Sequence, residues 1–576
     1  MSAARPPEGA RAPSGGSDPH AVGERGGTLN RLPPPTAWTT GSTEVFKTGT
    51  WRAQLPHYVA APSPCLQACP VNGEIARWIG LAHQRDFRGA WDVLAINNPF
   101  PAVAGRICHH PCESACNRGA YDESVAICKL ERAVGDMALA EGWAHQMPAQ
   151  ERAGHVAIVG GGPSGLSAAY QLRRRGWRVT IYESQPELGG LMRYGIPAYR
   201  LSREVLDGEI ARIVAMGVRV EQRQVTSLAQ FEQLRASHDA VYLAVGAGRP
   251  KRLPQLPLEA PWLIDGADYL ARTNAGAPPA LGRRLVVIGG GSAALDAARS
   301  ARRAGHEVTL LALERRAQMP AQQAEVDEAL EEGITLVDGA MLKSVKPANG
   351  SGVVLSCQQV RFEPGAVRGQ FTVTPVDGAE FTMAAHAVVT SIGQDPDLLA
   401  FAAAVPTARG LLAVDARQGT QADKVWAGGD AASMARFVTE AIGMGKRAAI
   451  DIDRALRAEA PGAVAAAPAV AVDAIALHHH PKLERATERV RAPAERLASG
   501  VEVQLGLELE QALAEAGRCF SCGTCTNCDN CFHYCPDLAI RRVDGGYQVL
   551  TDYCKGCGLC VQECPTGSLV MREESK

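Results

Sequence analysis

The chain has 576 residues, a formal net charge of −2 and 46% hydrophobic residues, of which few are aromatic. A nearly neutral chain lacks the basic footprint of a nucleic-acid-binding protein, and no stretch reaches the apolar length of a membrane span. Its N-terminus has no apolar signal segment, so 17 cysteines indicate metal ligation in the cytoplasm rather than a disulfide framework.

The N-terminal quarter divides into a tail and a cysteine-bearing region. Residues 1–60 are rich in Pro, Gly, Ser and Ala without apolar periodicity, so we expect a largely disordered or extended tail. Residues 61–150 contain helix-like stretches, which predict a helical domain that binds metal through its cysteines. These cysteines are Cys65, Cys69, Cys108, Cys112 and Cys116.

Short apolar strands alternate with Ala-rich helices over residues 155–456, which is typical of doubly wound parallel sheets. The first strand runs into Gly160-x-Gly162-x2-Gly165, whose glycines let a pyrophosphate approach the N-terminus of the next helix. The following strand ends at Glu183, whose carboxylate can accept hydrogen bonds from ribose hydroxyls. Strand, loop, helix and acid together predict a dinucleotide site.

Two later motifs indicate which dinucleotides bind. A small-residue strand ends in Gly429 and Asp430, as in the late FAD motif of flavoproteins with two dinucleotides. As an alternative, Asp430 only caps the next helix, but its pairing with the early glycine motif favours FAD. Between the two parts lies Gly289-x-Gly291-x2-Ala294, in which alanine at the third position is compatible with a nicotinamide dinucleotide. One such unit nested in another can bring nicotinamide to the flavin.

The C-terminal segment repeats the pattern Cys-x2-Cys-x2-Cys-x3-Cys-Pro. This is the spacing of bacterial two-cluster ferredoxins, in which the fourth cysteine of each run binds the other cluster. Paired CxxC motifs also bind zinc, but four ligands in one tight run are hard to arrange around zinc tetrahedra, so we predict [4Fe–4S] clusters. One set is Cys525, Cys528, Cys531 and Cys564, and the other is Cys535, Cys554, Cys557 and Cys560.

These patterns predict an α/β chain with a helical N-terminal Fe–S domain, two nested Rossmann-like domains and a C-terminal α+β bacterial-type ferredoxin. The expected boundaries are the tail 1–60, the Fe–S domain 61–150, the FAD domain 151–282 and 396–456, the NAD(P) domain 283–395, a linker 457–514 and the ferredoxin 515–576.

Seven motifs follow one another in a fixed order along the chain, at residues 105–108, 112–116, 160–165, 189–197, 289–291, 319–321 and 429–430. On these motifs the chain resembles, from Cys65 to about Asp451, the small subunit of NADPH-dependent glutamate synthase and the matching part of dihydropyrimidine dehydrogenase. The resemblance implies FAD, a nicotinamide cofactor and clusters in the N-terminal domain. It also implies that the loop with Gly190 and Arg193 lines the flavin face.

The chain departs from these families after the second nucleotide strand. The families have Tyr-Arg-Arg there, whose guanidiniums suit a 2′-phosphate. This chain has Glu314, which can accept from a free 2′-hydroxyl and favours NAD. Arg315 and Arg316 follow directly and can still reach a phosphate, so both NAD and NADP remain open.

A second departure concerns the N-terminal ligands. The resemblance implies that one cluster takes Cys69, Cys108, Cys112 and the non-cysteine ligand Glu131. The families also have an Arg-Cys-x2-Cys motif ahead of this group, whereas residues 1–64 contain no cysteine. A matching motif, with Cys519 and Cys522, precedes the ferredoxin.

We therefore hypothesise that Cys519 and Cys522 fold back to Cys65 and Cys116 and complete a fourth [4Fe–4S] cluster. In the alternative, the later pair are spare thiols and the N-terminal domain holds one cluster. Cys128 and Cys357 lack partners at cluster spacing and are expected to be small buried hydrophobic residues.

The ferredoxin segment contains distinctive runs at residues 534–537, 552–558 and 563–565, and it has Met571. On these residues it resembles the small ferredoxin subunit of 2-oxoacid:acceptor oxidoreductases. We therefore expect the reductase subunit of a larger, thiamine-diphosphate-dependent 2-oxoacid complex that passes electrons between NAD(P)(H), FAD and clusters. The alternatives are a glutamate synthase small subunit, an NAD(P)H:ferredoxin reductase, or a non-enzymatic redox scaffold or sensor. No pattern for nucleophilic or acid–base catalysis stands out, so we name no catalytic side chain.

Overall fold

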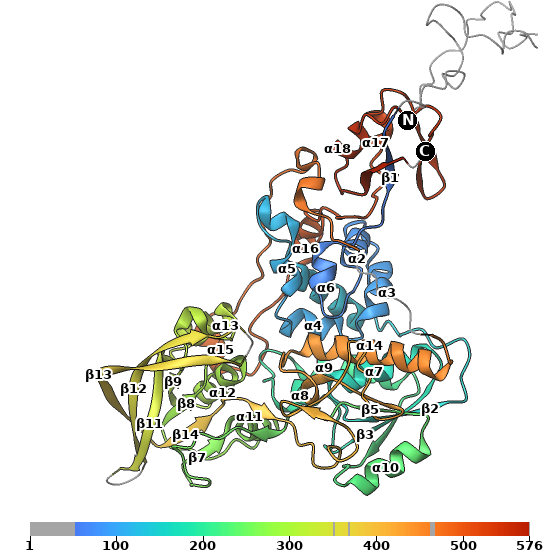
Figure 1. Cartoon of the computed structure of the whole chain (residues 1–576). Coiled ribbons are helices and arrows are strands. Elements are labelled where there is room, and N and C mark those ends of the chain that lie inside the picture. The colour runs from blue at the N-terminus through green and yellow to red at the C-terminus, as the bar shows by residue number, and fades with distance from the viewer. Residues whose placement is uncertain (1–51, 349–351, 367–368, 461–466, 575–576) are drawn as a thin grey trace, which may run out of the picture. The chain divides into compact units, whose positions relative to one another are not determined.

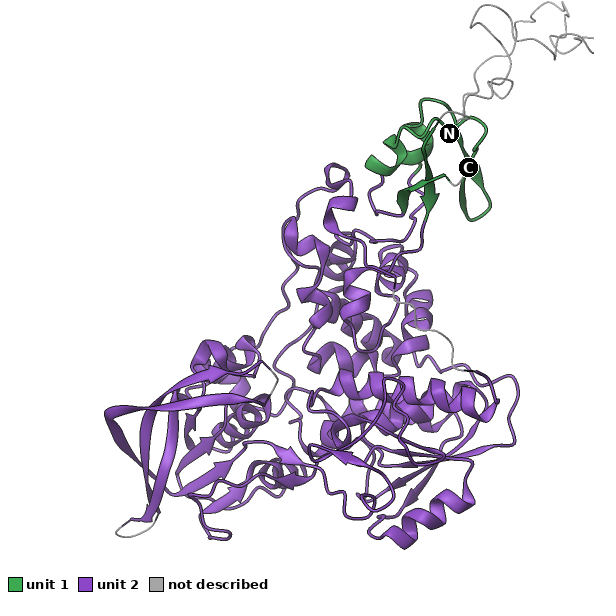
Figure 2. Cartoon of the chain, in the orientation of Figure 1, with its two compact units in different colours: residues 1–58, 529–563, 569–576 green, residues 59–528, 564–568 purple. Residues whose placement is uncertain are grey.

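The computed structural model describes residues 52–348, 352–366, 369–460 and 467–574. The chain forms two compact units (Figure 2). Of the described residues, 52–58, 529–563 and 569–574 belong to the smaller unit, and those within 59–528 and 564–568 belong to the larger one. Of the tail predicted over residues 1–60, the first 51 lie outside the described part. Within the described ranges, no helix has the length and apolarity that a membrane crossing requires.

The N-terminal part of the larger unit is helical, as predicted (Figure 1). Apolar residues at helical spacing, such as Ile127, Leu130 and Val134, form its core. A helix from far along the chain, α16 (Leu509–Ala516), adds Ala512 to the same core. The other helices are α1 (Pro64–Ala68), α2 (Ile75–His83), α3 (Phe87–Asn97), α4 (Pro101–Ile107), α5 (Pro111–Ser114) and α6 (Ile127–Ala140).

A five-stranded parallel sheet in the order β18-β5-β2-β3-β4 follows. Its strands are short and mostly buried, because helices cover them and leave little polar alternation. Two of these helices, α7 (Pro163–Arg174) and α14 (Val438–Leu456), pack against each other. The strands are β2 (His155–Val159), β3 (Arg178–Glu183), β4 (Arg219–Gln222), β5 (Ala240–Leu243) and β18 (Val425–Ala427).

A second five-stranded parallel sheet lies in sequence between β5 and β18, in the order β10-β9-β8-β14-β7. The prediction of one doubly wound unit nested in another is therefore confirmed. An antiparallel sheet of β11 (Ala340–Pro347), β12 (Val353–Pro364) and β13 (Phe371–Ala385) adjoins it. The parallel strands are β7 (Leu263–Asp265), β8 (Arg284–Ile288), β9 (Glu307–Leu311), β10 (Thr335–Val337) and β14 (Ala387–Thr390), with helices α11 (Gly266–Asn274), α12 (Ser292–Arg303) and α13 (Gln323–Glu331).

The segment 457–514 differs from the linker that its composition predicted. It contains α15 (Pro493–Ala498) and an antiparallel bridge between Val490 and Gln504. Glu502 pairs with the buried Arg106 of α4 at 2.5 Å. The polar side chains of this segment, which are typical of a solvated linker, thus form ion pairs with residues far away in the sequence. Composition alone cannot predict such pairs.

The smaller unit has an α+β arrangement, as predicted for the ferredoxin. Strand β1 (Gln54–Tyr58) pairs antiparallel with β21 (Leu569–Glu573). Arg52, ahead of β1, donates to the carbonyl of Cys554 at 3.0 Å and so ties the strand to the cysteine loop. The remaining elements are α17 (Asn530–His533), β19 (Ile540–Val543), β20 (Gly546–Val549) and α18 (Leu559–Gln562).

Candidate cofactor and cluster sites

The loop between β2 and α7 has the backbone of a dinucleotide-binding turn. Gly160 has φ +106°, and a Cβ there would collide with the carbonyl oxygen of Ala244. A Cβ on Gly165 would collide with the Gly160 oxygen, so neither position accepts a side chain. At Gly162, by contrast, the nearest described atom to such a Cβ is Gly190 Cα at 3.8 Å. The open space at the N-terminus of α7 therefore fits a pyrophosphate.

Two carboxylates approach this loop from different strands. Glu183, at the end of β3, accepts from the Gly161 N–H at 2.6 Å, which holds it beside the glycine turn. Asp430 follows Gly429, whose positive φ brings the backbone against Ser164 of α7. Burial raises the pKa of Asp430. The structure thus places both predicted acids at the start of α7, where ribose and ribityl hydroxyls can donate to them.

Arg193 lies on the short helix α8 (Leu191–Tyr194), directly after Gly190. Its Nε donates to the Leu188 carbonyl at 2.6 Å, and its guanidinium pairs with Glu187 and Asp207. These contacts hold the loop that carries Gly190 against Gly162. The structure therefore gives Arg193 a local bracing contact, and a role toward the flavin stays a prediction.

The loop between β8 and α12 repeats the geometry of the first one. Gly289 has φ +146°, and a Cβ there would collide with the Ser391 oxygen and approach Ala294. At Gly291 the nearest described atom to a Cβ is Pro320 Cγ at 4.0 Å, so the space is open. In both loops the first glycine, Gly160 or Gly289, leaves no room for a side chain, while open space lies beside Gly162 or Gly291. This shared geometry supports two dinucleotide sites in one chain.

The residues after β9 differ in how they meet this loop. The half-buried Glu314 lies against Gly290, so that a Cβ at that glycine would collide with the carboxylate. Burial raises the pKa of Glu314. Arg315 and Arg316 are exposed and pair instead with the acids Asp338 and Asp327. The structure brings Glu314, and not the arginine pair, to the glycine loop.

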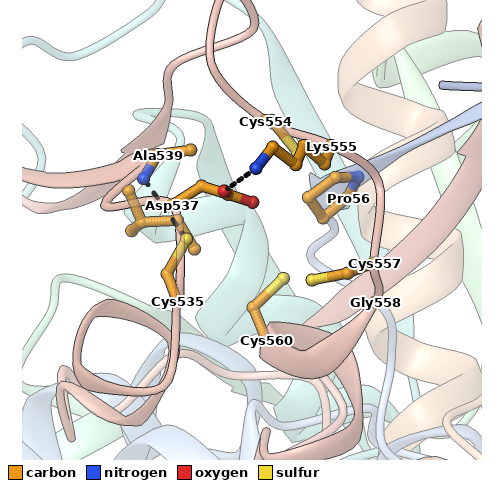
Figure 3. Close-up of a pocket in the computed structure, with 10 residues that line it drawn as sticks. Pro56, Cys535, Asp537, Ala539, Cys554, Lys555, Cys557, Gly558 and Cys560 are labelled. Atoms are coloured by element: carbon orange, nitrogen blue, oxygen red, sulfur yellow. Dashed lines mark hydrogen bonds and ion pairs between the residues drawn. The ribbon is translucent and has the colours of Figure 1, made fainter. Parts of the chain in front are cut away.

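Four cysteines of the smaller unit line one cavity (Figure 3). They are the set predicted for one ferredoxin cluster: Cys535, Cys554, Cys557 and Cys560. The N–H of Ala539 donates to Cys535 Sγ at 3.2 Å, and that of Gly556 donates to Cys554 Sγ at 3.4 Å. Such N–H···S bonds stabilise thiolates bound to iron. The donor set and its polar surroundings fit a [4Fe–4S] cluster.

The cysteines predicted for the other ferredoxin cluster fall in both units. In the larger unit, burial and then the charges of Cys564 and Cys528 raise the pKa of Cys525. In the smaller unit, the Tyr58 hydroxyl donates to Cys531 Sγ at 3.2 Å. All four stay predicted ligands.

The N-terminal domain gathers the set Cys69, Cys108, Cys112 and Glu131. Burial, followed by the charges of Cys69 and Cys108, raises the pKa of the Cys112 thiol. Burial raises the pKa of Glu131 to about 7, and the Asn98 amide donates to its carboxylate at 2.8 Å. Bringing four such groups out of water without a counter-charge is unfavourable. This donor set therefore fits a cluster that supplies the positive charge.

A second cavity, within the larger unit, is lined by Cys65, Cys116, Cys519 and Cys522. The Ser63 hydroxyl lies 3.1 Å from Cys65 Sγ, and the Asn117 amide donates to Cys522 Sγ at 3.5 Å. The structure thus brings the cysteine pair that precedes the ferredoxin to the N-terminal pair. Cys128 and Cys357 are buried elsewhere, in α6 and β12.

Sequence reasoning missed two polar neighbours of the N-terminal set. Asn98 contacts Glu131, and Thr439, at the start of α14, accepts from the Cys108 thiol at 3.7 Å. Neither residue lies in a recognisable motif. Thr439 is separated from Cys108 by more than 300 positions, so only the folded chain brings the two together.

Three families match the chain in consecutive stretches. The pyridine nucleotide-disulphide oxidoreductase family matches residues 154–445. The 4Fe–4S domain II of dihydropyrimidine dehydrogenase matches residues 59–143, and a 4Fe–4S dicluster domain matches residues 524–569. The predicted resemblance of the reductase part is therefore confirmed.

Curated relatives align over most of the chain. The NADP(+)-dependent formate dehydrogenase subunit beta of Moorella thermoacetica is 34% identical over 82% of this chain and 72% of its own length. The NAD-dependent dihydropyrimidine dehydrogenase subunit PreT of Escherichia coli (strain K12) is 34% identical over 67% of this chain and 89% of its own length. The glutamate synthase [NADPH] small chain of Azospirillum brasilense is 32% identical over 70% of this chain and 88% of its own length.

These likenesses extend over the glycine loops and the cysteine-bearing domains whose geometry is described above. They support an enzyme rather than a non-enzymatic scaffold or sensor. The chain belongs to the pyridine nucleotide-disulphide oxidoreductase family, as an NAD(P)-dependent flavoprotein oxidoreductase with [4Fe–4S] domains.

Proposed function

We propose that this chain is the electron-transfer subunit of a larger oxidoreductase and exchanges electrons between NAD(P)(H) and its clusters through FAD. The supporting observation is that two dinucleotide loops of matching geometry and cysteine-lined cavities occur in one chain. When bound, FAD exchanges a hydride with nicotinamide and single electrons with clusters. The protein's part is to hold these groups in order and at short range.

Helix α14 supports a short path between the flavin and the N-terminal cluster set. Thr439, at its start, contacts Cys108. Gly445, further along, packs so tightly on α7 that a Cβ there would collide with the Ser164 oxygen. Six residues of helix span about 9 Å. One helix thus touches both the Cys69/Cys108/Cys112/Glu131 set and the helix that carries the FAD loop.

A glycine variant tests flavin binding. Gly162→Val should fill the open space at the start of α7 and lower the affinity for FAD at least tenfold, the equivalent of about 1.4 kcal/mol, so that the protein purifies with less FAD than wild type. The measurement is bound flavin per folded chain by absorbance. Gly500→Val, at an exposed glycine with open space around it, is the matched control. Full flavin occupancy in folded Gly162→Val would refute the assignment.

Reduction by nicotinamide tests the electron path. Adding NADH or NADPH under anaerobic conditions should bleach the flavin absorbance and then reduce a one-electron dye. A chain that holds FAD but is reduced by neither nucleotide would contradict the proposed direction of exchange with NAD(P)(H).

For the partner, we propose a thiamine-diphosphate-dependent 2-oxoacid oxidoreductase, on the likeness of the ferredoxin segment. A formate-oxidising subunit is a second candidate, favoured by the similarity over 82% of the chain to a formate dehydrogenase subunit beta. A glutamate synthase large subunit or a free ferredoxin remains a further alternative. Affinity purification of the tagged chain from its own host, with thiamine diphosphate and formate oxidation assayed in the co-purified subunits, separates these partners.

A further inference from the structure

Cys519 and Cys522 stand outside both cluster-domain matches. The N-terminal match ends at residue 143, and the C-terminal match begins at residue 524. The pair nevertheless lines one cavity with Cys65 and Cys116, more than 400 positions away. Family membership alone therefore assigns this pair no metal, and only the folded chain shows which groups face it.

Buried charges hold this cysteine pair in place. Arg518, only 1% exposed, pairs with Glu515 at 2.7 Å and with Asp122 at 3.1 Å. Arg118, also 1% exposed, pairs with Asp122 at 2.6 Å and donates to the carbonyl oxygen of Arg518 at 2.5 Å. Two guanidiniums that share one carboxylate thus fix the residue directly before Cys519. A loop of spare thiols would not need such an anchor.

The other end of the loop is fixed as well. The Gly523 N–H donates to the Thr566 carbonyl at 2.7 Å, and the buried Phe520 packs with Val470 and Ile475. Between these anchors, the Ser521 N–H donates to Cys519 Sγ at 3.4 Å. Both sulfurs of the pair accept hydrogen bonds from polar neighbours, as do thiolates bound to iron.

We propose that Cys65, Cys116, Cys519 and Cys522 bind one [4Fe–4S] cluster whose ligands come from opposite ends of the chain. Four thiols that line one cavity match the ligand number of one [4Fe–4S] cluster. The cluster would be the fourth in the chain. This inference deepens the proposed function and rests on it for the cluster's place in electron transfer.

Metal analysis of the full chain, purified without oxygen, is the first test. Four [4Fe–4S] clusters give about sixteen irons and as many sulfides per chain, whereas three give about twelve. A count of about twelve irons, or of one zinc per chain beside twelve irons, would overturn the proposal. This measurement uses the wild-type protein and so does not depend on any variant folding.

Cysteine variants then test which residues form the site. Cys519→Ser and Cys65→Ser should each lose about four irons. The double variant should also lose about four and not eight, because both residues would belong to one cluster. Cys357→Ala, at a buried thiol in β12, is the matched control and should keep full iron. Unchanged iron in Cys519→Ser, or additive loss in the double variant, would contradict a shared site.

Flavin content and flavin bleaching by NAD(P)H are read on the same samples. If bleaching is absent in the wild type while sixteen irons are present, the proposed function fails and the cluster assignment stands. If bleaching persists in Cys519→Ser with iron unchanged, the cluster assignment alone fails.

Discussion

At the residue scale, a single carboxylate position distinguishes the two nucleotide loops from generic glycine turns. Glu183 and Glu314 both lie against the second glycine of their loops, Gly161 and Gly290. Glu183 is the last residue of β3, whereas Glu314 stands three residues beyond the end of β9. The side chain therefore reaches the same place from a different backbone position, and a sequence offset alone does not exclude that role.

This position predicts a preference for NADH. A carboxylate at the ribose accepts from a free 2′-hydroxyl and repels a 2′-phosphate. Glu314→Ala should lower kcat/KM for NADH at least tenfold, the equivalent of about 1.4 kcal/mol, and should raise it for NADPH. Steady-state dye reduction with both nucleotides measures the ratio.

Arg316→Ala is the control for this experiment, because Arg316 is exposed and pairs with Asp327 rather than with the glycine loop. In Arg316→Ala the ratio of kcat/KM for NADH to that for NADPH should stay within about twofold of wild type, because a solvent-exposed ion pair contributes little energy. A ratio that responds to Arg316 and not to Glu314 would reverse the assignment.

At the element scale, the junction between α4 and α9 (Arg203–Val214) depends on a buried acid. Glu209 is fully buried in α9, and its oxygens accept the N–H groups of Ala102 and Val103 at 2.9 and 3.0 Å. These are orphan donors in the first turn of α4, so the carboxyl closes that helix end from another element. Burial raises the pKa of Glu209 to about 8.

This raised pKa predicts a pH-dependent stability. The unfolded side chain loses its proton near its ordinary value of 4.5, and the folded one near 8. The stabilisation from this group is therefore fully present below pH 4.5 and is lost as pH rises to about 8. The melting temperature of wild type should fall as pH rises from 6 to 8. In Glu209→Gln, whose side chain does not titrate, it should fall less steeply over the same range. Equal slopes in the two proteins would show that Glu209 is ionised throughout.

At the scale of the larger unit, the segment 489–505 connects three parts of the fold. Glu502 pairs with Arg106 and Arg132 of the cluster domain. Val503 donates its N–H to the Tyr199 carbonyl at 2.9 Å in the FAD part, and Arg496 pairs with Glu331 of α13 in the nucleotide part. A segment that separates domains in sequence thus binds them together in the structure.

Removing its central acid should therefore destabilise the fold. Arg106 and Arg132 are 5% and 6% exposed, so Glu502→Ala removes an acid that both buried guanidiniums share and leaves them Asp136 as their common partner. We expect a loss of about 3 kcal/mol in the free energy of unfolding, seen as a lower melting temperature. Glu307→Ala, which removes an exposed pair with Arg283, should change the free energy of unfolding by less than about 0.5 kcal/mol. Equal effects of the two substitutions would contradict the bridging role.

The sequence by itself determined the parts of this protein whose chemistry is local. Glycine spacing determined the two dinucleotide turns, because the glycine that has no room for a side chain, such as Gly160, and the glycine beside open space, such as Gly162, lie within one loop. Cysteine spacing in the C-terminal repeat grouped the thiols around Cys557 before any fold was known, because iron ligation restricts neighbouring residues in the same short run.

Tertiary structure decided what depends on contacts between distant positions. Only the fold places Cys519 against Cys65, directs Glu314 rather than Arg315 toward the glycine loop, and gives Glu502 its buried partners. Each of these side chains is polar or small, and its local pattern suits a solvated loop equally well. Their environment depends on packing between segments that are separate in the sequence, by hundreds of residues for Cys519 and Glu502, and a single sequence holds no local signal for that packing.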